Sequence, residues 1–280
     1  MRIFNTRALP RQPRGAVPWT MLRSRHMKIR VLGAFGAEGL AQRPTAFLIN
    51  DTILLDCGTV GGALTVPEQL LIEHALVSHS HLDHVAGLAF LTETLAFFDP
   101  RPPVTVAGVE PVVDMLRTGV FNGVVWPDFT KIPSVEAPVM RYRTLEEETE
   151  QRVGGLWVTP VSVSHSIPTT GFILHDGATG LVYSGDTGPT AAIWKAARGV
   201  GGLRAVMLEC AYPNRLAALA RIAGHMTPEL VRRELDKLPP DLPVWIYHVK
   251  PQFHEEIAAE LDGLDAGRVA IIEQDKTYTV

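Results

Sequence analysis

The segment VSHSHLDHVAGL gathers four residues of metal-ligand type within six positions: His79, His81, Asp83 and His84. It follows a strand-like run and precedes an apolar run with helical spacing, so the four side chains can converge. Imidazole nitrogens and carboxylate oxygens suit divalent ions such as zinc, and crowded imidazoles disfavour one another's protonation. The alternative is a histidine-rich loop in which Asp83 only caps a helix. The density of ligands favours a metal site.

A single cluster cannot complete two metal sites, and three later residues could supply the missing ligands. His165 ends the strand-like run VTPVSVSH, Asp186 stands in SGDTG after GLVYS, and His248 follows PVWIY. Taken singly, such a residue is more often a turn or core group, and Asp186 could merely cap a helix. Because each comes just after a β run, the three together predict the remaining ligands.

The elements that must position these residues alternate between strands and helices from Met27 onward. TAFLIN and TILLDCG predict a hairpin around Asn50 and Asp51, and the acidic run LEEETEQRVGG is interpreted as a solvated turn. Both halves of the chain carry strands and then helices, which predicts an α/β (α+β) sandwich of two sheets with helices outside. The expected helices span residues 85–98, 110–118, 191–197, 228–237 and 255–261.

The distribution of charge argues against a polyanionic partner. The net charge is −4, but residues 1–26 carry six arginines and no acid, which leaves 20 basic and 30 acidic side chains in residues 27–280. A domain with this excess of acidic residues would repel a long nucleic acid, which argues against extended nucleic-acid binding. No window is apolar enough to predict a membrane span. A small-molecule substrate is favoured.

Residues 1–26 are expected to form a basic, disordered N-terminal extension, and residues 27–280 one catalytic domain. The extension lacks a convincing secretory signal, so the cytoplasm is the default location. Cys57 and Cys210 stand in apolar runs and are interpreted as reduced core residues. A homodimer is left open. Four histidines lack a motif and are interpreted as surface or structural groups: His26, His74, His175 and His254.

The motif HxHxDH, a later lone histidine, an aspartate in GDT and a final histidine resemble, in this order, the metallo-β-lactamase superfamily. The resemblance covers residues 27–280 and implies a four-layer αββα sandwich with the site at one edge. It also implies that Asp56 lies beneath the site. His81 stands where redox di-iron members usually carry glutamate, which favours the hydrolytic, zinc-type branch. The family's assignment gives one metal His79, His81 and His165, the other Asp83, His84 and His248, and makes Asp186 the bridge.

Further stretches, among them VSHSIPTTGFIL, LECAYPN, GHMTPE and HVKP, are similar to class II cyclic nucleotide phosphodiesterases. This resemblance implies two divalent ions, best suited to Zn²⁺ with Mn²⁺ or Fe²⁺ as alternatives. It implies hydrolysis of 3′,5′-cyclic nucleotides (cAMP or cGMP) to 5′-nucleotides by a metal-bridging hydroxide that Asp83 and Asp186 orient. His225 would protonate the leaving oxygen, and Glu209 would orient His225. Alternatively, His225 only precedes a helix and Glu209 pairs with a nearby base.

Three other functions stay open at this point. A ribonuclease Z-like enzyme would keep the fold and the metals but process RNA, and a lactone or thioester hydrolase could use the same site. A metal-binding scaffold without activity is the third. Trp126, Trp194 or Phe253 could stack on a purine, or these rings only pack in the interior. A phosphate could contact Ser166, Thr169 or Lys250, or these residues only form turns.

Overall fold

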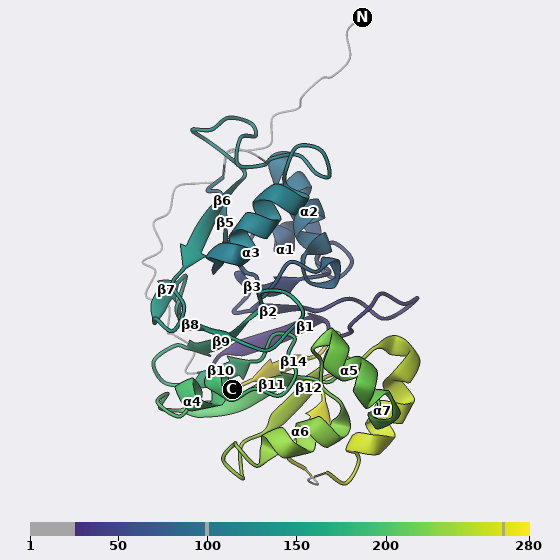
Figure 1. Ribbon diagram of the computed structural model, residues 1–280. Coiled ribbons are helices and arrows are strands. Elements are labelled where there is room, and N and C mark those ends of the chain that lie inside the picture. Colours follow the sequence, from purple (N-terminus) through teal and green to yellow (C-terminus); the bar gives the residue numbers. More distant parts are fainter. Residues whose placement is uncertain (1–25, 99–100, 265–266) are drawn as a thin grey trace, which may run out of the picture.

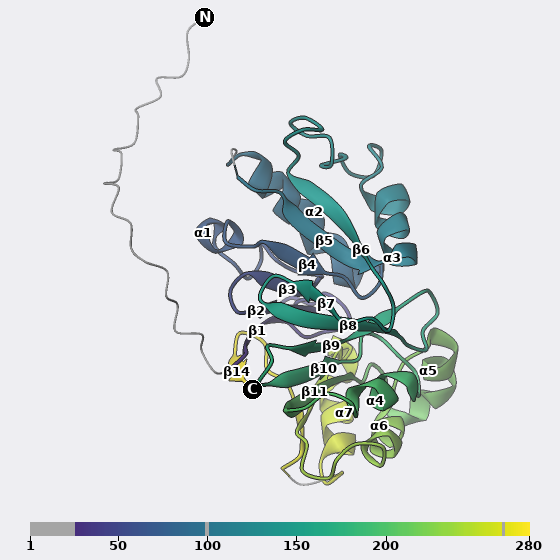
Figure 2. The same cartoon turned by 90° about the vertical axis from the view of Figure 1, so that its left-hand side faces the viewer.

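The computed structural model describes residues 26–98, 101–264 and 267–280. The predicted extension, residues 1–26, lies outside the described residues except for its last position. Two seven-stranded sheets lie face to face, and helices cover the outer face of each (Figures 1 and 2). The predicted four-layer sandwich is confirmed.

The first sheet has the strand order β14-β1-β2-β3-β4-β5-β6. Its β2–β3 hairpin turns at Asn50 and Asp51, whose φ angles of 49° and 63° are those of a tight hairpin turn. From β3 to β6 the strands are parallel. The strands span Lys28–Gly33 (β1), Ala46–Ile49 (β2), Ile53–Cys57 (β3), His74–Leu76 (β4), Val104–Val109 (β5), Met140–Leu145 (β6) and Thr277–Thr279 (β14).

The second sheet has the order β13-β12-β11-β10-β9-β8-β7. Strands β7 to β10 are antiparallel, and β10 to β13 are parallel. Because β8 and β10 both run antiparallel to β9, the strands β8, β10, β11 and β12 all end at one edge. They span Gln151–Val153 (β7), Leu156–Ser162 (β8), Thr170–His175 (β9), Gly180–Tyr183 (β10), Leu203–Glu209 (β11), Val244–Tyr247 (β12) and Val269–Ile271 (β13).

Helices α1 to α3 pack on the first sheet and α4 to α7 on the second (Figure 1). One apolar cluster fills the space between the sheets, and two more lie between each sheet and its helices. None of the described helices is long and apolar enough to cross a bilayer. The helices span Val66–Gln69 (α1), Leu82–Ala96 (α2), Glu110–Met115 (α3), Ala192–Ala197 (α4), Ala217–Ala223 (α5), Pro228–Leu235 (α6) and His254–Leu261 (α7), with shorter turns at Leu116–Val120 (η1), Asn214–Leu216 (η2) and Pro251–Phe253 (η3).

Two local expectations are corrected. Helix α2 begins at Leu82, three residues earlier than expected, with His81 at its N-cap position. Consequently Asp83 lies in the first helical turn. The acidic run is more than a turn, because Gln151–Val153 forms strand β7 and pairs with β8. Its cross-strand neighbour is the apolar strand β8, and pairing with it overrides the polar composition of the run.

Candidate metal centre

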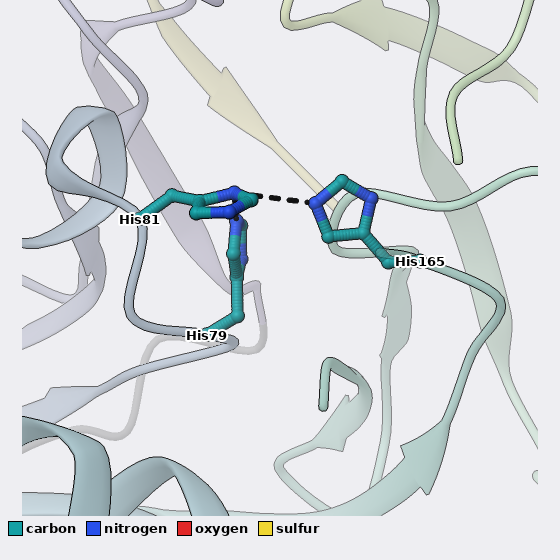
Figure 3. A group of neighbouring side chains, drawn as sticks. All are labelled: His79, His81 and His165. Atoms are coloured by element: carbon teal, nitrogen blue, oxygen red, sulfur yellow. Dashed lines mark hydrogen bonds between the residues drawn. The ribbon is translucent and has the colours of Figure 1, made fainter. Parts of the chain in front are cut away.

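The first predicted ligand group comes together at the edge of the sandwich where β4 and β8 end. His79 and His81 lie in the loop between β4 and α2, and His165 lies just after β8. Figure 3 shows the three rings turned toward a common point. His81 Nδ1 lies 3.1 Å from His79 Nε2 and 3.3 Å from His165 Nε2. Nitrogens so close within one group can share a single cation.

The second group lies beside the first, and Asp186 stands between the two. Asp83, His84 and His248 bring one ligand atom each within 4.8 Å of one another. Asp186 Oδ2 is 3.2 Å from His84 Nε2, 3.0 Å from His248 Nε2 and 3.7 Å from His79 Nε2. A carboxylate that reaches ligands of both groups is placed to bridge two ions.

Four histidines of the centre are held through Nδ1, which leaves Nε2 to face the cluster. The Nδ1 partners are Ser78 Oγ at 3.0 Å for His79, Asp56 Oδ2 at 2.8 Å for His84, the Gly224 carbonyl at 2.9 Å for His165 and Thr45 Oγ1 at 3.0 Å for His248. Metal-binding histidines usually have such outer partners, which fix the orientation of the ring.

Asp56 lies beneath His84, where the resemblance predicted it, and joins the two sheets. Besides His84, its carboxylate accepts hydrogen bonds from the Ser78 amide and hydroxyl at 2.7 Å each. The Tyr183 hydroxyl donates to it at 2.5 Å from strand β10 of the opposite sheet. All of these groups are buried. This network therefore ties a predicted ligand of one sheet to a strand of the other.

The donor set fits a cation. Within the described residues, His84 Nε2, His248 Nε2 and Asp186 Oδ1 are buried and make no well-aligned hydrogen bond, even though both nitrogens lie close to Asp186 Oδ2. Such an arrangement is costly unless a ligand fills it. Burial lowers the pKa of His79, His81, His165 and His248. The pKa of His84 is raised instead, because the carboxylates of Asp186 and Asp56 outweigh the effect of its burial. Although burial opposes its charge, the imidazoles of His248 and His84 hold the pKa of Asp186 well below its usual range.

Two glycines allow the close packing of the centre. A Cβ on Gly58 would lie 2.0 Å from the Asp83 carbonyl oxygen, and one on Gly36 would lie 2.8 Å from His248 Nε2. Any larger residue at either position would push the ligand away. His248 itself has φ 63°, a strained value for a non-glycine residue and one that recurs at functional sites.

Beside the metal ligands, His225 and Glu209 form a buried pair. His225 Nδ1 lies 2.8 Å from Glu209 Oε1 and 4.0 Å from Asp186 Oδ2, and its ring lies 4.9 Å from that of His165. Burial opposes its protonation, but the Glu209 carboxylate outweighs this effect and raises the pKa of His225. Burial also raises the pKa of Glu209. The pair is arranged to hold a proton next to the centre, although His225 is also close enough to His165 and Asp186 to serve as a ligand.

The remaining residues named from the sequence differ in their surroundings. Trp194 is a core residue that donates to Glu234 at 2.6 Å, and Trp126 donates to the Ala89 carbonyl at 3.0 Å. Both indoles pack against apolar side chains of the core. The Thr169 hydroxyl donates within its own turn, to Ile167 O at 2.9 Å. Both cysteines are buried and free. The other histidines lie outside the ligand groups: His74 starts β4, His175 contacts Glu150 and His254 starts α7.

Sequence reasoning missed several residues that orient the ligands. Thr45 and Tyr183 come from elements distant in the chain, and Gly224 contributes only a carbonyl oxygen, which leaves no side-chain signal. Ser78 could have been noticed, because it stands inside the motif SHSHLDH.

The fold and the paired ligand groups are those of a metal-dependent hydrolase. Residues 51–248 match the β-lactamase superfamily domain, and the chain belongs to that family. The predicted superfamily is thereby confirmed.

The relatives point to phosphodiesters. The chain is 30% identical over 209 residues to the probable 3′,5′-cyclic-nucleotide phosphodiesterase of Yersinia pestis, an alignment that covers 66% of this chain but only 59% of that protein. It is 29% identical over 258 residues to the 3′,5′-cyclic-nucleotide phosphodiesterase of Aliivibrio fischeri, covering 74% and 76%. It is similar in fold to unliganded yeast PDE1, with a TM-score of 0.76 and 17% identity over 90% of this chain and 99% of that one.

Proposed function

We propose that the protein is a dinuclear metal-dependent phosphodiesterase that hydrolyses 3′,5′-cyclic nucleotides, cAMP or cGMP, to 5′-nucleotides. The observation that supports the proposal is the position of Asp186, which lies between two groups of possible ligands and 4.0 Å from His225 Nδ1. The cyclic-nucleotide phosphodiesterases among the relatives support the choice of substrate. A single catalytic domain over residues 27–280 and a cytoplasmic location are parts of the same proposal.

In this proposal His79, His81 and His165 would hold one ion, Asp83, His84 and His248 would hold the other, and Asp186 would be shared by both. The nitrogen-rich donor set suits Zn²⁺ best. When bound, a metal pair lowers the pKa of water and neutralises charge on a phosphate. The outer hydrogen bonds to Asp56 and Thr45 keep the ligand rings in place for both ions.

His225 supplies the proton that the leaving group needs. The attacking water releases one proton to solvent, its oxygen forms the new bond to phosphorus, and the bond from phosphorus to the 3′ oxygen breaks. Because Glu209 engages Nδ1 of His225, the opposite nitrogen, Nε2, is left to deliver a proton to the departing 3′ oxygen. Glu209 holds the ring and stabilises its charged form, so the carboxylate acts through His225.

The test is a substrate panel assayed with protein loaded with Zn²⁺ or Mn²⁺. It contains 3′,5′- and 2′,3′-cyclic nucleotides, an aryl phosphodiester, a tRNA precursor and several lactones. We expect the highest kcat/KM for a 3′,5′-cyclic nucleotide, with the 5′-nucleotide as product. Turnover of the tRNA precursor or the lactones alone would overturn the assignment of substrate and leave the metal centre standing.

A ribonuclease Z-like activity is the second candidate. The chain is 37% identical over 86 residues to the ribonuclease Z of Halorubrum lacusprofundi, a stretch that covers 29% of this chain. The excess of acidic residues in residues 27–280 favours a small phosphodiester over an RNA. A homodimer stays a prediction that the substrate panel does not address.

A further inference from the structure

Lys250 lies beside the proposed ligand His248, two residues along the chain. Its ammonium group donates a hydrogen bond of 2.7 Å to the carbonyl oxygen of Gly36, in the loop between β1 and β2. Gly36 packs directly against the His248 ring, where an added Cβ would come within 2.8 Å. The ammonium group therefore holds a loop that packs on the ring of a proposed metal ligand.

The charge of Lys250 is not neutralised by a neighbouring carboxylate. Among the residues that the structure describes, Lys250 forms no ion pair, whereas the partly buried Lys237 contacts Glu234 at 2.6 Å. Arg215 is likewise paired with a carboxylate, Glu256, at 2.7 Å. A half-buried ammonium group without a counter-ion can bind an anion.

Tyr212 adds a neutral donor next to this cation. The Lys250 Nζ lies 5.7 Å from the centre of the Tyr212 ring, and the same ring lies 5.6 Å from that of His225. Burial raises the pKa of Tyr212, helped by the carboxylates of Glu209 and Asp83, so its hydroxyl stays protonated. In the described part of the chain this hydroxyl has no hydrogen-bond partner, which leaves its proton available.

We propose that Lys250 and Tyr212 bind the phosphoryl group of the substrate, with the ammonium and the hydroxyl contacting its non-bridging oxygens on the His225 side of the centre. The inference rests on the proposed function and narrows it: the substrate is an anion at the reacting atom. A neutral ester or lactone gains little from such a cation. Lys250 and Tyr212, which are not metal ligands, would therefore make the site prefer phosphodiesters to neutral esters and lactones.

Binding of inorganic phosphate to the metal-loaded protein, measured by calorimetry, tests the inference without relying on turnover. Lys250→Met should weaken phosphate binding by about 10- to 100-fold, the usual effect of losing a charge-assisted hydrogen bond. Tyr212→Phe should weaken it less, by a few fold. Both variants should keep the metal content of the parent. Lys195→Met, which removes an exposed lysine of α4, is the control for net charge and should bind as the parent does.

A purely structural role for Lys250, pinning Gly36, predicts a different pattern. Lys250→Gln keeps a donor for the Gly36 carbonyl but removes the charge. If Lys250 had only this structural role, the variant would bind phosphate as the parent does. We expect its phosphate binding to stay weak. Parent-like phosphate binding by Lys250→Gln or Lys250→Met with intact metal content would overturn the proposal. If the parent protein binds phosphate through Lys250 but hydrolyses no cyclic nucleotide, the proposed function fails while this anion site stands.

Discussion

The two halves of the sandwich contribute to the metal centre in different ways. The first sheet supplies a contiguous group, from His79 to His84, in one loop and the first turn of α2. The second sheet supplies single residues, His165, Asp186 and His248, each after a different strand. The contiguous residues are positioned by their own loop and helix, whereas the three single residues meet only because strands β8, β10 and β12 end at one edge. The second half therefore contains Asp186, the residue that the proposal places between the two ion sites.

Replacing Asp186 should have the largest effect. Asp186→Ala removes the only carboxylate that reaches His79, His84 and His248 within the described centre. We expect loss of at least one ion and a fall in kcat/KM well beyond the roughly 100-fold that an outer partner costs. His81→Ala, from the contiguous group, should weaken mainly one site. Metal analysis and kinetics of both variants measure the difference, and equal metal loss would contradict the contrast between the halves.

His225→Ala should lower turnover while both ions remain bound. Removal of a general acid costs about 10²- to 10⁴-fold, and the loss should shrink for substrates with good leaving groups. The measurement compares a cyclic nucleotide with an activated aryl phosphodiester. A loss of the same size for both substrates would remove His225 as the proton donor, and a loss of metal would make it a ligand.

The outer partners of the ligands sharpen the comparison further. His84 is held by a carboxylate that also bonds Tyr183 of the opposite sheet, whereas His248 is held by the neutral hydroxyl of Thr45. Asp56→Asn should therefore weaken metal affinity by about 10- to 100-fold, and Thr45→Val by less. Competition with a chelator ranks the two variants. A larger loss for Thr45→Val would contradict this order.

A smaller effect is expected far from the centre, at the start of α1. Hydrogen bonds from Thr65 and Arg30 lower the pKa of Glu68 from its ordinary value of 4.5 to about 2. Because the folded pKa is depressed, this stabilisation is complete above about pH 4.5 and is lost as the pH falls toward 2. Glu68→Gln should flatten the fall of Tm across that window and leave the metal content unchanged. An unaltered profile would show that Glu68 contributes nothing.

The same contrast explains what could be predicted from the sequence. The contiguous cluster and the β2–β3 hairpin are local patterns, and they appear in the structure where they were expected. Glu209 and His225 needed a family resemblance, because their pairing depends on tertiary packing between β11 and the loop before α6. Strands β6, β7 and β14 were missed because polar residues interrupt their short runs. Tyr183 was missed because its contact with Asp56 crosses between the sheets.

The measurement that tests the central claim most directly is the number of divalent ions bound per chain. The protein is stripped with a chelator, titrated with Zn²⁺ in a calorimeter and analysed for metal by mass spectrometry. We expect two bound ions per chain in the parent protein and fewer in Asp186→Ala. A parent protein that remains folded and saturates with one ion or none would contradict the dinuclear centre.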